Sequence, residues 1–468
     1  MRRIALALPP CRPLATSCGE GPGVGRKLLK IFISGLFALL LVGLASITTF
    51  SSDDDVPASR GGAAVPPPIP QPQPAPARID YARLQARLVR LMEDPAMVGM
   101  GVAVIEGGQV RLLQGYGETL HGSGQPVTPD TLFRWASLSK GASAALTLKL
   151  AERARVDLNH PIAKHAPTLR LPGGGEQRAT VADILSHRTG LNSNAWDDKL
   201  EDGGDARVLR ASLFATPSRC PPGTCYAYQN IAYDAVSDIA ERATGKPMPD
   251  LLVSELFRPL GMRSANASLA GLQSAPSWAR GHKGGANPRP IENNDNYYRV
   301  PAAGGVNSSI RDLARWMLAN MGHAPAVLPP KLLAELQRPR VATPGELSRQ
   351  RRYRERLTGA RYALGWREYE YAGHRLVGHN GAVNGYLAAI LFDPALQTGV
   401  AVLWNSGGRK PWAIKYEVMD MVYGLEPRDW MELDDASRPA EVAAAQAAAP
   451  PVQPVQPVSN ETRAQTGR

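Results

Sequence analysis

Nucleic-acid-binding features are missing from this sequence, although its net charge is +11. Part of that charge lies in a short run of arginines, which are Arg349, Arg351, Arg352, Arg354 and Arg356. The run lacks a set of aromatic stacking platforms for bases, and it matches no nucleic-acid-binding motif. No nucleic acid is therefore expected as a partner. We interpret the run as a solvated loop, with contact to an anionic wall polymer or lipid headgroups as the alternative.

Cysteine and aromatic residues are also scarce, and no internal repeat is present. The 468 residues include 4 cysteines and 6% aromatic residues, whereas 44% of the chain is hydrophobic. Neither a metal site nor a cofactor is expected. The hydrophobic content is ample for a large core, so we expect one large domain or two intimate ones.

An uncharged apolar run covers residues 31–50, with basic residues before it and aspartates after it. This arrangement predicts a cytoplasmic N-terminus and places the later residues outside the cytoplasm. Residues 1–50 are therefore predicted to be a cytoplasmic stub with a transmembrane signal-anchor, or else a cleaved signal peptide. We favour the anchor, which would hold the protein at the periplasmic face of the inner membrane. Cleavage would release it into the periplasm.

Two segments have compositions that do not support a core. Residues 51–78 are rich in proline and are predicted to form an extended linker. Residues 434–468 are rich in alanine, proline and glutamine and are predicted to be a disordered tail. The folded domain is accordingly expected at 79–433.

The order of the expected elements predicts the architecture of this domain. Strands are expected near both of its ends, and helices dominate the middle. The expected elements are a helix at 81–92, a hairpin of 99–105 and 110–116, a helix from 138, a helix at 232–244, strands at 374–379, 386–392 and 399–404, and a helix at 412–423. We expect one antiparallel sheet flanked by helices, with its two halves far apart in sequence and a mainly helical subdomain inserted.

Ser137 is the candidate nucleophile, because it precedes a helix that is apolar around most of its circumference. At a helix N-terminus, free N–H groups favour developing negative charge. Lys140 lies on the same face, three residues on. Burial would disfavour its ammonium form and make it a proton acceptor near neutral pH. Ser-x-x-Lys alone is a weak signal, and a purely structural role fits equally well.

Tyr228 and Asn230 form a second candidate pair, which follows a Pro-Pro-Gly turn. Two residues apart in extended chain, they face the same side. A phenol beside a lysine can relay protons, and the amide of Asn230 can hold a substrate carbonyl. A buried structural pair is the alternative.

The His-x-Gly pattern occurs twice, at His379-Asn-Gly381 and at His282-Lys-Gly284. We select His379, because it belongs to the end of a strand whose backbone could line a site. His282 lies among glycines, an asparagine and a proline, which indicate a loop.

In their order and spacing, Ser137-Leu-Ser-Lys140, Tyr228-Gln-Asn230 and His379-Asn-Gly381 resemble the three motifs of the serine β-lactamase and penicillin-binding protein superfamily, in its class C-like branch. The segments 179–191, 257–262 and 301–314 are similar to further landmarks of that branch. The resemblance covers roughly residues 80–425 and implies an α/β sandwich with a mainly helical subdomain.

Site roles follow from the resemblance, residue by residue. It implies that Ser137 is acylated, that Lys140 accepts its proton, and that Tyr228 activates the deacylating water and protonates leaving groups. Asn230 would orient the substrate amide. The N–H groups of Ser137 and Ala382 would form an oxyanion hole.

His379 departs from the Lys-Thr-Gly motif of class C β-lactamases and resembles the D,D-carboxypeptidase and D-aminopeptidase relatives. We expect a periplasmic serine hydrolase of D-amino-acid peptides, with peptidoglycan as a possible partner. An esterase, a β-lactamase and a non-enzymatic wall-binding protein are the alternatives. Histidine is mostly neutral above pH 7, so the site should be less cationic, and binding of carboxylates should require protonated His379.

Cys220 and Cys225 enclose a short loop before Tyr228 and are expected to form a disulfide in an oxidising compartment. Two free thiols are the alternative. Cys11 and Cys18 precede the apolar run and should stay reduced.

Overall fold

The structure is a computed structural model that describes residues 78–434. The predicted membrane segment, the linker up to residue 77 and the tail from residue 435 lie outside the described residues. Among residues 78–434, no helix is long and apolar enough to span a bilayer.

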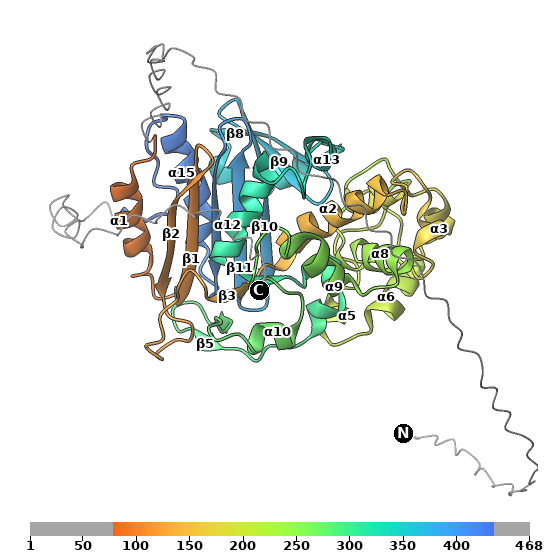
Figure 1. Ribbon diagram of the computed structural model, residues 1–468, viewed down its shortest axis with the longest axis horizontal. Coiled ribbons are helices and arrows are strands. Elements are labelled where there is room, and N and C mark those ends of the chain that lie inside the picture. The colour runs from red at the N-terminus through yellow and green to blue at the C-terminus, as the bar shows by residue number, and fades with distance from the viewer. Residues whose placement is uncertain (1–77, 435–468) are drawn as a thin grey trace, which may run out of the picture. The chain divides into compact units, whose positions relative to one another are not determined.

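The elements of the described region follow the expected order, with strands near both ends and helices between (Figure 1). The strands are β1 (Gly99–Glu106), β2 (Gln109–Gly117), β3 (Leu132–Arg134), β4 (His282–Lys283), β5 (Arg289–Pro290), β6 (Asn307–Ser309), β7 (Val341–Ala342), β8 (Leu357–Tyr362), β9 (Arg367–Tyr371), β10 (His374–Val383), β11 (Tyr386–Asp393) and β12 (Thr398–Trp404). The α-helices are α1 (Tyr81–Leu91), α2 (Ser139–Glu152), α3 (Ile162–His165), α4 (Val181–Leu185), α5 (Asp197–Glu201), α6 (Ala206–Ser212), α7 (Asn230–Tyr233), α8 (Ala235–Thr244), α9 (Met248–Leu252), α10 (Leu269–Gln273), α11 (Pro301–Gly304), α12 (Ile310–Leu318), α13 (Pro330–Leu336), α14 (Pro344–Arg349) and α15 (Ile414–Val422). Shorter 3₁₀ or π segments are η1 (Ala136–Leu138), η2 (Pro172–Gln177), η3 (Leu213–Ala215), η4 (Val253–Phe257), η5 (Asn296–Arg299), η6 (Ala319–His323), η7 (Arg351–Tyr353) and η8 (Lys410–Ala413).

The main sheet has eight strands in the order β2-β1-β12-β11-β10-β9-β8-β7, and every neighbouring pair is antiparallel. Its two halves come from the two ends of the domain and meet where Val102 of β1 lies opposite Val402 of β12. Helices α2 to α9 lie between β3 and β6 in the sequence and form a subdomain beside the sheet (Figure 1). The predicted antiparallel sheet with an inserted helical subdomain is confirmed.

The central strands bury both faces of the sheet, because side chains alternate along a strand. On β1, Ala103 packs into a core shared with α2 and α12, whereas Val102 packs into a core shared with α1 and α15. All residues of β1 and β12 are buried. The sheet is therefore a layer between helices, as an α/β sandwich requires.

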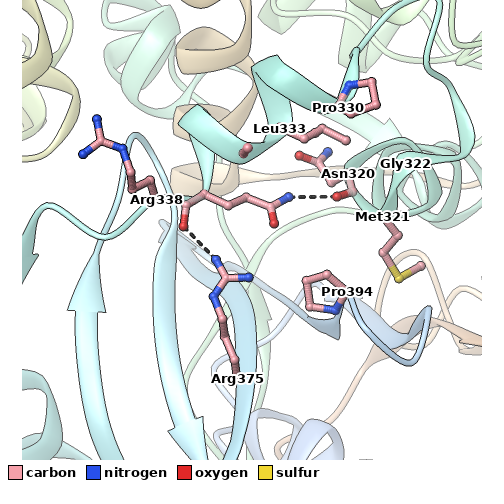
Figure 2. Close-up of a pocket in the computed structure, with 10 residues that line it drawn as sticks. Asn320, Met321, Gly322, Pro330, Leu333, Arg338, Arg375 and Pro394 are labelled. Carbon is pink, nitrogen blue, oxygen red and sulfur yellow. Dashed lines mark hydrogen bonds between the residues drawn. The ribbon is translucent and has the colours of Figure 1, made fainter.

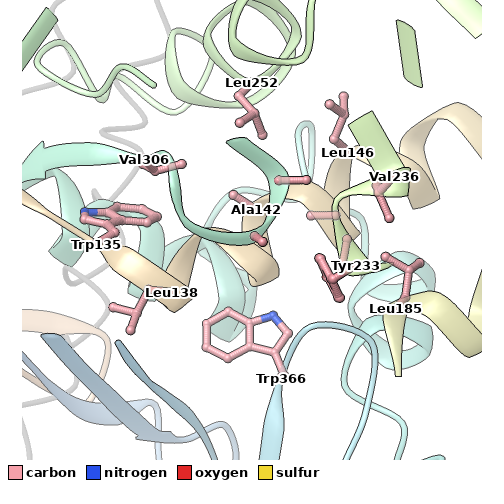
Figure 3. Close-up of a cluster of buried hydrophobic side chains, with 14 of the residues drawn as sticks. Trp135, Leu138, Ala142, Leu146, Leu185, Tyr233, Val236, Leu252, Val306 and Trp366 are labelled. Atoms are coloured by element: carbon pink, nitrogen blue, oxygen red, sulfur yellow. The ribbon is translucent and has the colours of Figure 1, made fainter. Parts of the chain in front are cut away.

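Helix α2 is buried around its whole circumference from Ser139 to Leu148 (Figure 3). A Cβ atom at Gly141 would lie 2.8 Å from the indole of Trp366, so only glycine permits this close approach. The helix thus holds the residues at its N-terminal end in a fixed position against the sheet.

Three features of the fold differ from the sequence-based expectations. Strand β10 continues to Val383, so the His-Asn-Gly segment lies within a strand and not at its end. Strands β8 and β9 were not predicted, because charged residues such as Arg361 and Glu368 interrupt the apolar alternation; these two lie opposite each other and form an ion pair at 2.8 Å. Ser137 lies in η1, just before α2 begins.

The arginine run lies at the end of α14, in η7 and just after it, so it is partly helical and not a simple loop, although all of its arginines except Arg356 are exposed, as expected of a solvated segment. Arg349 and Arg352 pair with Glu346 and Glu432, at 3.7 and 3.0 Å. Arg356, which is 8% exposed, pairs with Asp420. Much of the charge of this run is therefore compensated within the fold.

Candidate active site

Ser137 is half-buried at the centre of η1, and the residue before it has an unusual backbone conformation. Ala136 has a φ of 49°, in the left-handed region that side chains other than glycine seldom adopt. The Ser139 hydroxyl donates to the Ala136 carbonyl at 2.6 Å and accepts from the N–H of Val306 at 3.0 Å. Such strain persists where surrounding contacts enforce it, which is common at functional sites.

Lys140 is completely buried, and its Nζ contacts three oxygen atoms. It donates to Asn230 Oδ1 at 2.7 Å and to the Ala303 carbonyl at 2.8 Å, and it lies 3.3 Å from Ser137 Oγ. Burial lowers its pKa to about 7. A neutral amine has two N–H groups and one lone pair. Because two obligate acceptors occupy the N–H groups, the lone pair is left for the Ser137 hydroxyl.

Asn230 is oriented by Asp197, a residue that the sequence analysis missed. Asn230 Nδ2 donates to Asp197 Oδ2 at 2.7 Å, so its Oδ1 must face Lys140. The other carboxylate oxygen of Asp197 is buried without a partner, and burial raises the pKa of Asp197 to about 6. No pattern marked Asp197 in the sequence, because the short acidic segment that forms α5 has the composition of an ordinary solvated segment.

Tyr228 is the second group in contact with the nucleophile. Its hydroxyl donates to Ser137 Oγ at 2.8 Å, and Lys140 Nζ lies 4.7 Å from the centre of its ring. Burial raises the pKa of Tyr228 above its usual value, so the phenol is protonated at neutral pH. Ser137 Oγ can thus accept a hydrogen bond from Tyr228 while its own hydroxyl proton is directed at the lone pair of Lys140.

His187 fixes the position of Tyr228 and was also missed as an individual residue. The rings of His187 and Tyr228 have centres 4.2 Å apart. His187 Nδ1 accepts from the N–H of Gln229 at 3.2 Å, and its carbonyl accepts from Ala227 at 2.9 Å. Burial holds the pKa of His187 well below its ordinary value, so the ring is neutral. Its place in the 179–191 landmark was the only sequence signal.

His379 is buried, and its ring does not have the position expected of a carboxylate ligand. Nδ1 lies 2.7 Å from the Asn380 carbonyl, to which it donates, so Nε2 accepts from the Tyr362 hydroxyl at 3.0 Å. Burial, and then the charges of Arg367 and Lys140, lower its pKa well below 6.5. The proposed protonation of His379 for carboxylate binding is therefore not supported, because both nitrogens are satisfied in the neutral ring.

Gly381 brings β10 against the turn that carries Ser137. A Cβ atom at this position would lie 2.3 Å from the Trp135 carbonyl and 3.2 Å from Ala136 Cβ. The next residue, Ala382, is exposed on the same strand. The predicted oxyanion-hole partners Ser137 and Ala382 thus belong to two segments that are in contact.

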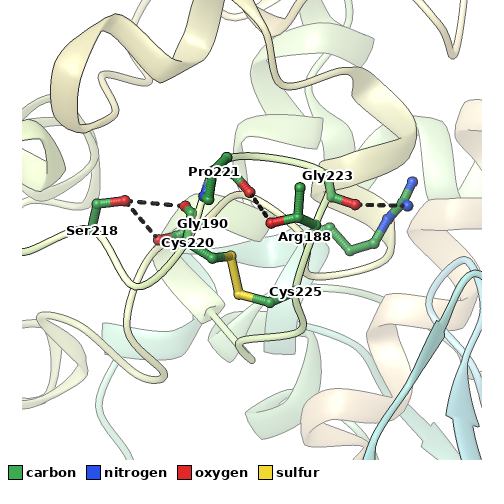
Figure 4. The surroundings of a disulfide bond; sticks show 8 residues. Arg188, Gly190, Ser218, Cys220, Pro221, Gly223 and Cys225 are labelled. Carbon is green, nitrogen blue, oxygen red and sulfur yellow. Dashed lines mark hydrogen bonds between the residues drawn. A yellow bond between two sulfur atoms is a disulfide. The ribbon is translucent and has the colours of Figure 1, made fainter.

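The structure pairs Cys220 with Cys225 (Figure 4). The enclosed loop is held against the segment that contains His187, because Gly223 donates to the Arg188 carbonyl at 2.7 Å and Arg219 donates to the Gly190 carbonyl at 2.8 Å. Tyr228 follows Cys225 by three residues. The disulfide therefore stiffens the strand-like segment that leads to Tyr228.

Reduction of this disulfide is expected to destabilise the domain by about 2 kcal/mol, since the closed loop is short. In the unreduced, denatured protein, the peptide with Cys220 and Cys225 should resist alkylation, while Cys11 and Cys18 of the full chain should react. Peptide mapping by mass spectrometry after alkylation measures both pairs. Two alkylated thiols at 220 and 225 without reductant would contradict the pairing.

His282, which the sequence analysis discarded, has a structural role. Its Nδ1 lies 3.0 Å from the Asn405 carbonyl, and Nε2 accepts from the N–H of His121 at 3.2 Å. It lies in β4 and not in a loop, but both ring nitrogens are occupied.

A separate cavity of about 480 Å³ lies between η6, α13 and the start of β10 (Figure 2). None of its lining residues is a candidate site residue. Its two arginines are already engaged, Arg375 with the Gln337 carbonyl at 2.8 Å and Arg338 with Glu335 at 3.0 Å. The surroundings of Ser137 are thus a better candidate for the active site than this cavity.

Comparisons with known proteins agree with this geometry. The family model described as Beta-lactamase matches residues 84–420. The unguisins hydrolase ungD' of Aspergillus campestris is 30% identical over 356 residues, covering 71% of this chain and 64% of the relative. The D-alanyl-D-alanine-carboxypeptidase/endopeptidase AmpH of Escherichia coli K12 is 30% identical over 230 residues, covering 47% of this chain and 56% of the relative. The chain thus spans less than two thirds of the length of these relatives.

Among solved structures, the octameric penicillin-binding protein homologue from Pyrococcus abyssi superposes with a TM-score of 0.67. It is 24% identical, and the match covers 75% of this chain and 79% of that one. At this level of identity, the likeness establishes a shared fold.

Proposed function

Since the chain belongs to the Beta-lactamase family and residues 84–420 form a serine hydrolase domain of that family, we propose that it acts through an acyl-enzyme on Ser137. We propose D-amino-acid peptides of the cell wall as its substrates. The observation that carries the proposal is the contact of Ser137 Oγ with both Lys140 Nζ and Tyr228 OH, at 3.3 and 2.8 Å.

In the proposed acylation step, Ser137 Oγ attacks the substrate carbonyl, and its proton passes to the lone pair of neutral Lys140. The N–H groups of Ser137 and Ala382 would stabilise the oxyanion. As the C–N bond breaks, Tyr228 donates its proton to the leaving amine, and the Lys140 ammonium restores the phenol. Water then attacks the acyl-enzyme by the same route in reverse.

The protonation state of Tyr228 changes the catalytic role that was expected for it. A buried phenol with a raised pKa is a poor general base in the resting enzyme. Lys140, with a pKa of about 7, is the better initial proton acceptor. We therefore assign the base to Lys140 and the acid to Tyr228 during acylation. In deacylation, Tyr228 takes the proton of the attacking water as it passes its own proton to neutral Lys140, and the Lys140 ammonium then protonates Ser137 Oγ as the acyl C–O bond breaks.

Substrates with a carboxylate beside the scissile bond are expected to gain nothing from His379, because its ring is neutral. From pH 5 to 9, kcat/KM for an anionic D-alanyl peptide and for a neutral nitrophenyl ester should follow parallel profiles. His379→Gln should leave them parallel and lower stability by about 1–3 kcal/mol, since it disrupts the buried bond with Tyr362.

The control for this measurement is His374→Gln, an exposed histidine of the same strand that stacks on Tyr423 with ring centres 3.7 Å apart. It should change neither the profiles nor the stability substantially. An affinity for the anionic peptide that falls selectively as pH rises through 6 to 7 in the wild type, but not in His379→Gln, would restore the carboxylate-binding role.

An esterase is the second candidate, and the neutral ring of His379 favours it, because a neutral ester needs no cationic partner. A short-chain nitrophenyl ester, a D-amino-acid peptide amide and a chromogenic cephalosporin, compared by kcat/KM, separate esterase, peptidase and β-lactamase. A non-enzymatic wall-binding protein would turn over none of them and would resist fluorophosphonate labelling.

We also propose that the protein works at the periplasmic face of the inner membrane or in the periplasm. The pairing of Cys220 with Cys225 supports an oxidising compartment. Peptidoglycan would then be the accessible polymer that contains D-amino acids.

A further inference from the structure

Arg367 brings a permanent positive charge to the site from β9, the strand next to β10. It lies opposite Gly378, one residue before His379. Its guanidinium carbon is 5.7 Å from the centre of the Tyr228 ring and 5.5 Å from that of Tyr362. Arg367 is only 9% exposed. A permanent cation is thus present on the strand beside the neutral His379.

The charge of Arg367 is only partly compensated. Its one ion-pair partner among residues 78–434 is Glu346 of α14, at 3.0 Å. Nη1 makes this contact, whereas Nε is buried without a hydrogen-bond partner. A guanidinium that served packing alone would be expected to have its donors satisfied. The positive charge of Arg367 therefore also acts on the neighbouring side chains, most of which are phenols.

The ionisable groups around Arg367 and Lys140 come from every element packed against them. Those that face Arg367 are Glu346 of α14, Tyr226 and Tyr228 before α7, Tyr362 of β8, Tyr369 of β9, His379 of β10 and Lys415 of α15. Those that face Lys140 are Asp197, Asp234, His187, Tyr228, Tyr233, His379 and Arg367.

The charge of Arg367 favours the catalytic protonation states. Burial lowers the pKa of Lys140 most, and Arg367 lowers it further, whereas Asp197 and Asp234 raise it. Burial raises the pKa of Tyr228, and the hydrogen bond with Ser137 and the charge of Arg367 oppose that effect. A positive charge at this place therefore supports a neutral Lys140 and a transient Tyr228 phenolate.

We propose that Arg367 is a positioning residue that supplies the permanent positive charge of the active site, in place of a charged residue at position 379. The inference rests on the proposed function, because Arg367 acts on Ser137 only through Lys140 and Tyr228. The histidine at position 379 can therefore be neutral, and its ring binds the Tyr362 hydroxyl and the Asn380 carbonyl.

The test is the pH dependence of Ser137 labelling by a neutral fluorophosphonate between pH 5 and 10, in the full-length protein. The rate should rise with pH as Lys140 loses its proton, with a midpoint near 7. Removal of a nearby positive charge raises the pKa of Lys140, so the midpoint should move up by about 1 pH unit. Arg367→Lys keeps the charge and should keep the midpoint of the wild type.

Arg367→Gln alone would leave the buried Glu346 carboxylate with only the exposed Arg349, at 3.7 Å, as a cationic partner, which endangers folding. The charge-free variant is therefore the double variant Arg367→Gln, Glu346→Gln, and Glu346→Gln alone is its matched control. Only the double variant should move the midpoint upward. Arg361→Gln of β8, an exposed arginine paired with Glu368, controls for general charge and should have no effect.

A double variant that is folded, as judged by circular dichroism and Tm, and that keeps the midpoint of the wild type would overturn the inference. An equal shift in Glu346→Gln would overturn it as well, because the ion pair and not the cation would then matter. Failure of the proposed function has a different signature, since the wild type itself would not be labelled at Ser137.

Discussion

Ser137→Ala should abolish labelling by a fluorophosphonate and reduce hydrolysis of every substrate by about 10³-fold or more, because the covalent intermediate cannot form. The fold should survive. Alanine fits η1, and the hydroxyl makes only two side-chain hydrogen bonds, to Tyr228 and Lys140. The loss of these bonds should cost about 0.5–1.5 kcal/mol each. Gel fluorescence after labelling, kcat/KM and Tm are the three measurements.

The matched control is Ser143→Ala, one turn further along α2. Its hydroxyl bonds only to carbonyl groups, among them that of Ala302 at 2.8 Å. This variant should lose some stability and keep both labelling and turnover. Turnover by Ser137→Ala at the rate of the wild type would rule out the proposed nucleophile.

Lys140→Met should reduce kcat/KM by about 10²–10⁴-fold, since it removes the group that accepts the Ser137 proton. Stability should fall too. Asn230 Oδ1 and the Ala303 carbonyl would be left buried without a donor, which costs about 1–3 kcal/mol for each group. Activity must therefore be measured well below the Tm of the variant, with the folded fraction determined by circular dichroism.

Lys149→Met is the matched control for this variant, because Lys149 lies on the same helix and donates only to the Val327 carbonyl, at 2.9 Å. It should keep kcat/KM within about threefold of the wild type, as expected for a substitution far from the chemistry. If folded Lys140→Met retained the activity of the wild type with an unchanged pH profile, Lys140 would not be the base.

The sequence allowed the chemical centre of the site to be predicted because its members are close in sequence within each motif. The spacing of Ser137 and Lys140 determines their contact once a helix follows, and the burial of that helix was visible in its composition. Tyr228 and Asn230 lie next to a turn and a helix start, which also leave local signals. Their catalytic roles stay predictions until the variants are measured.

The residues that orient Asn230 and shift the pKa values of Lys140 and Tyr228 could not be predicted, because only the tertiary packing brings them to the site. In the sequence, Asp197 and Arg367 are indistinguishable from the other charged residues of two polar segments. Only the tertiary structure shows that one holds Asn230 and the other lies beside Tyr228. His379 was identified from its His-x-Gly pattern. Its buried, neutral state could not be predicted, because it depends on contact with Tyr362 of a strand that was not predicted.

The pairing of β1 with β12 has a consequence for how the enzyme is made. Val102 and Val402 are partners although about 300 residues separate them, so the central sheet cannot close until nearly the whole domain has been synthesised. Ser137 and Lys140 are among the early residues, yet the strand that bounds their site arrives in the last quarter of the domain. Contacts of such long range make folding slow. For most of its synthesis, the nascent chain therefore contains Ser137 without strand β10, which bounds the site. Activity begins only when synthesis of the domain is complete.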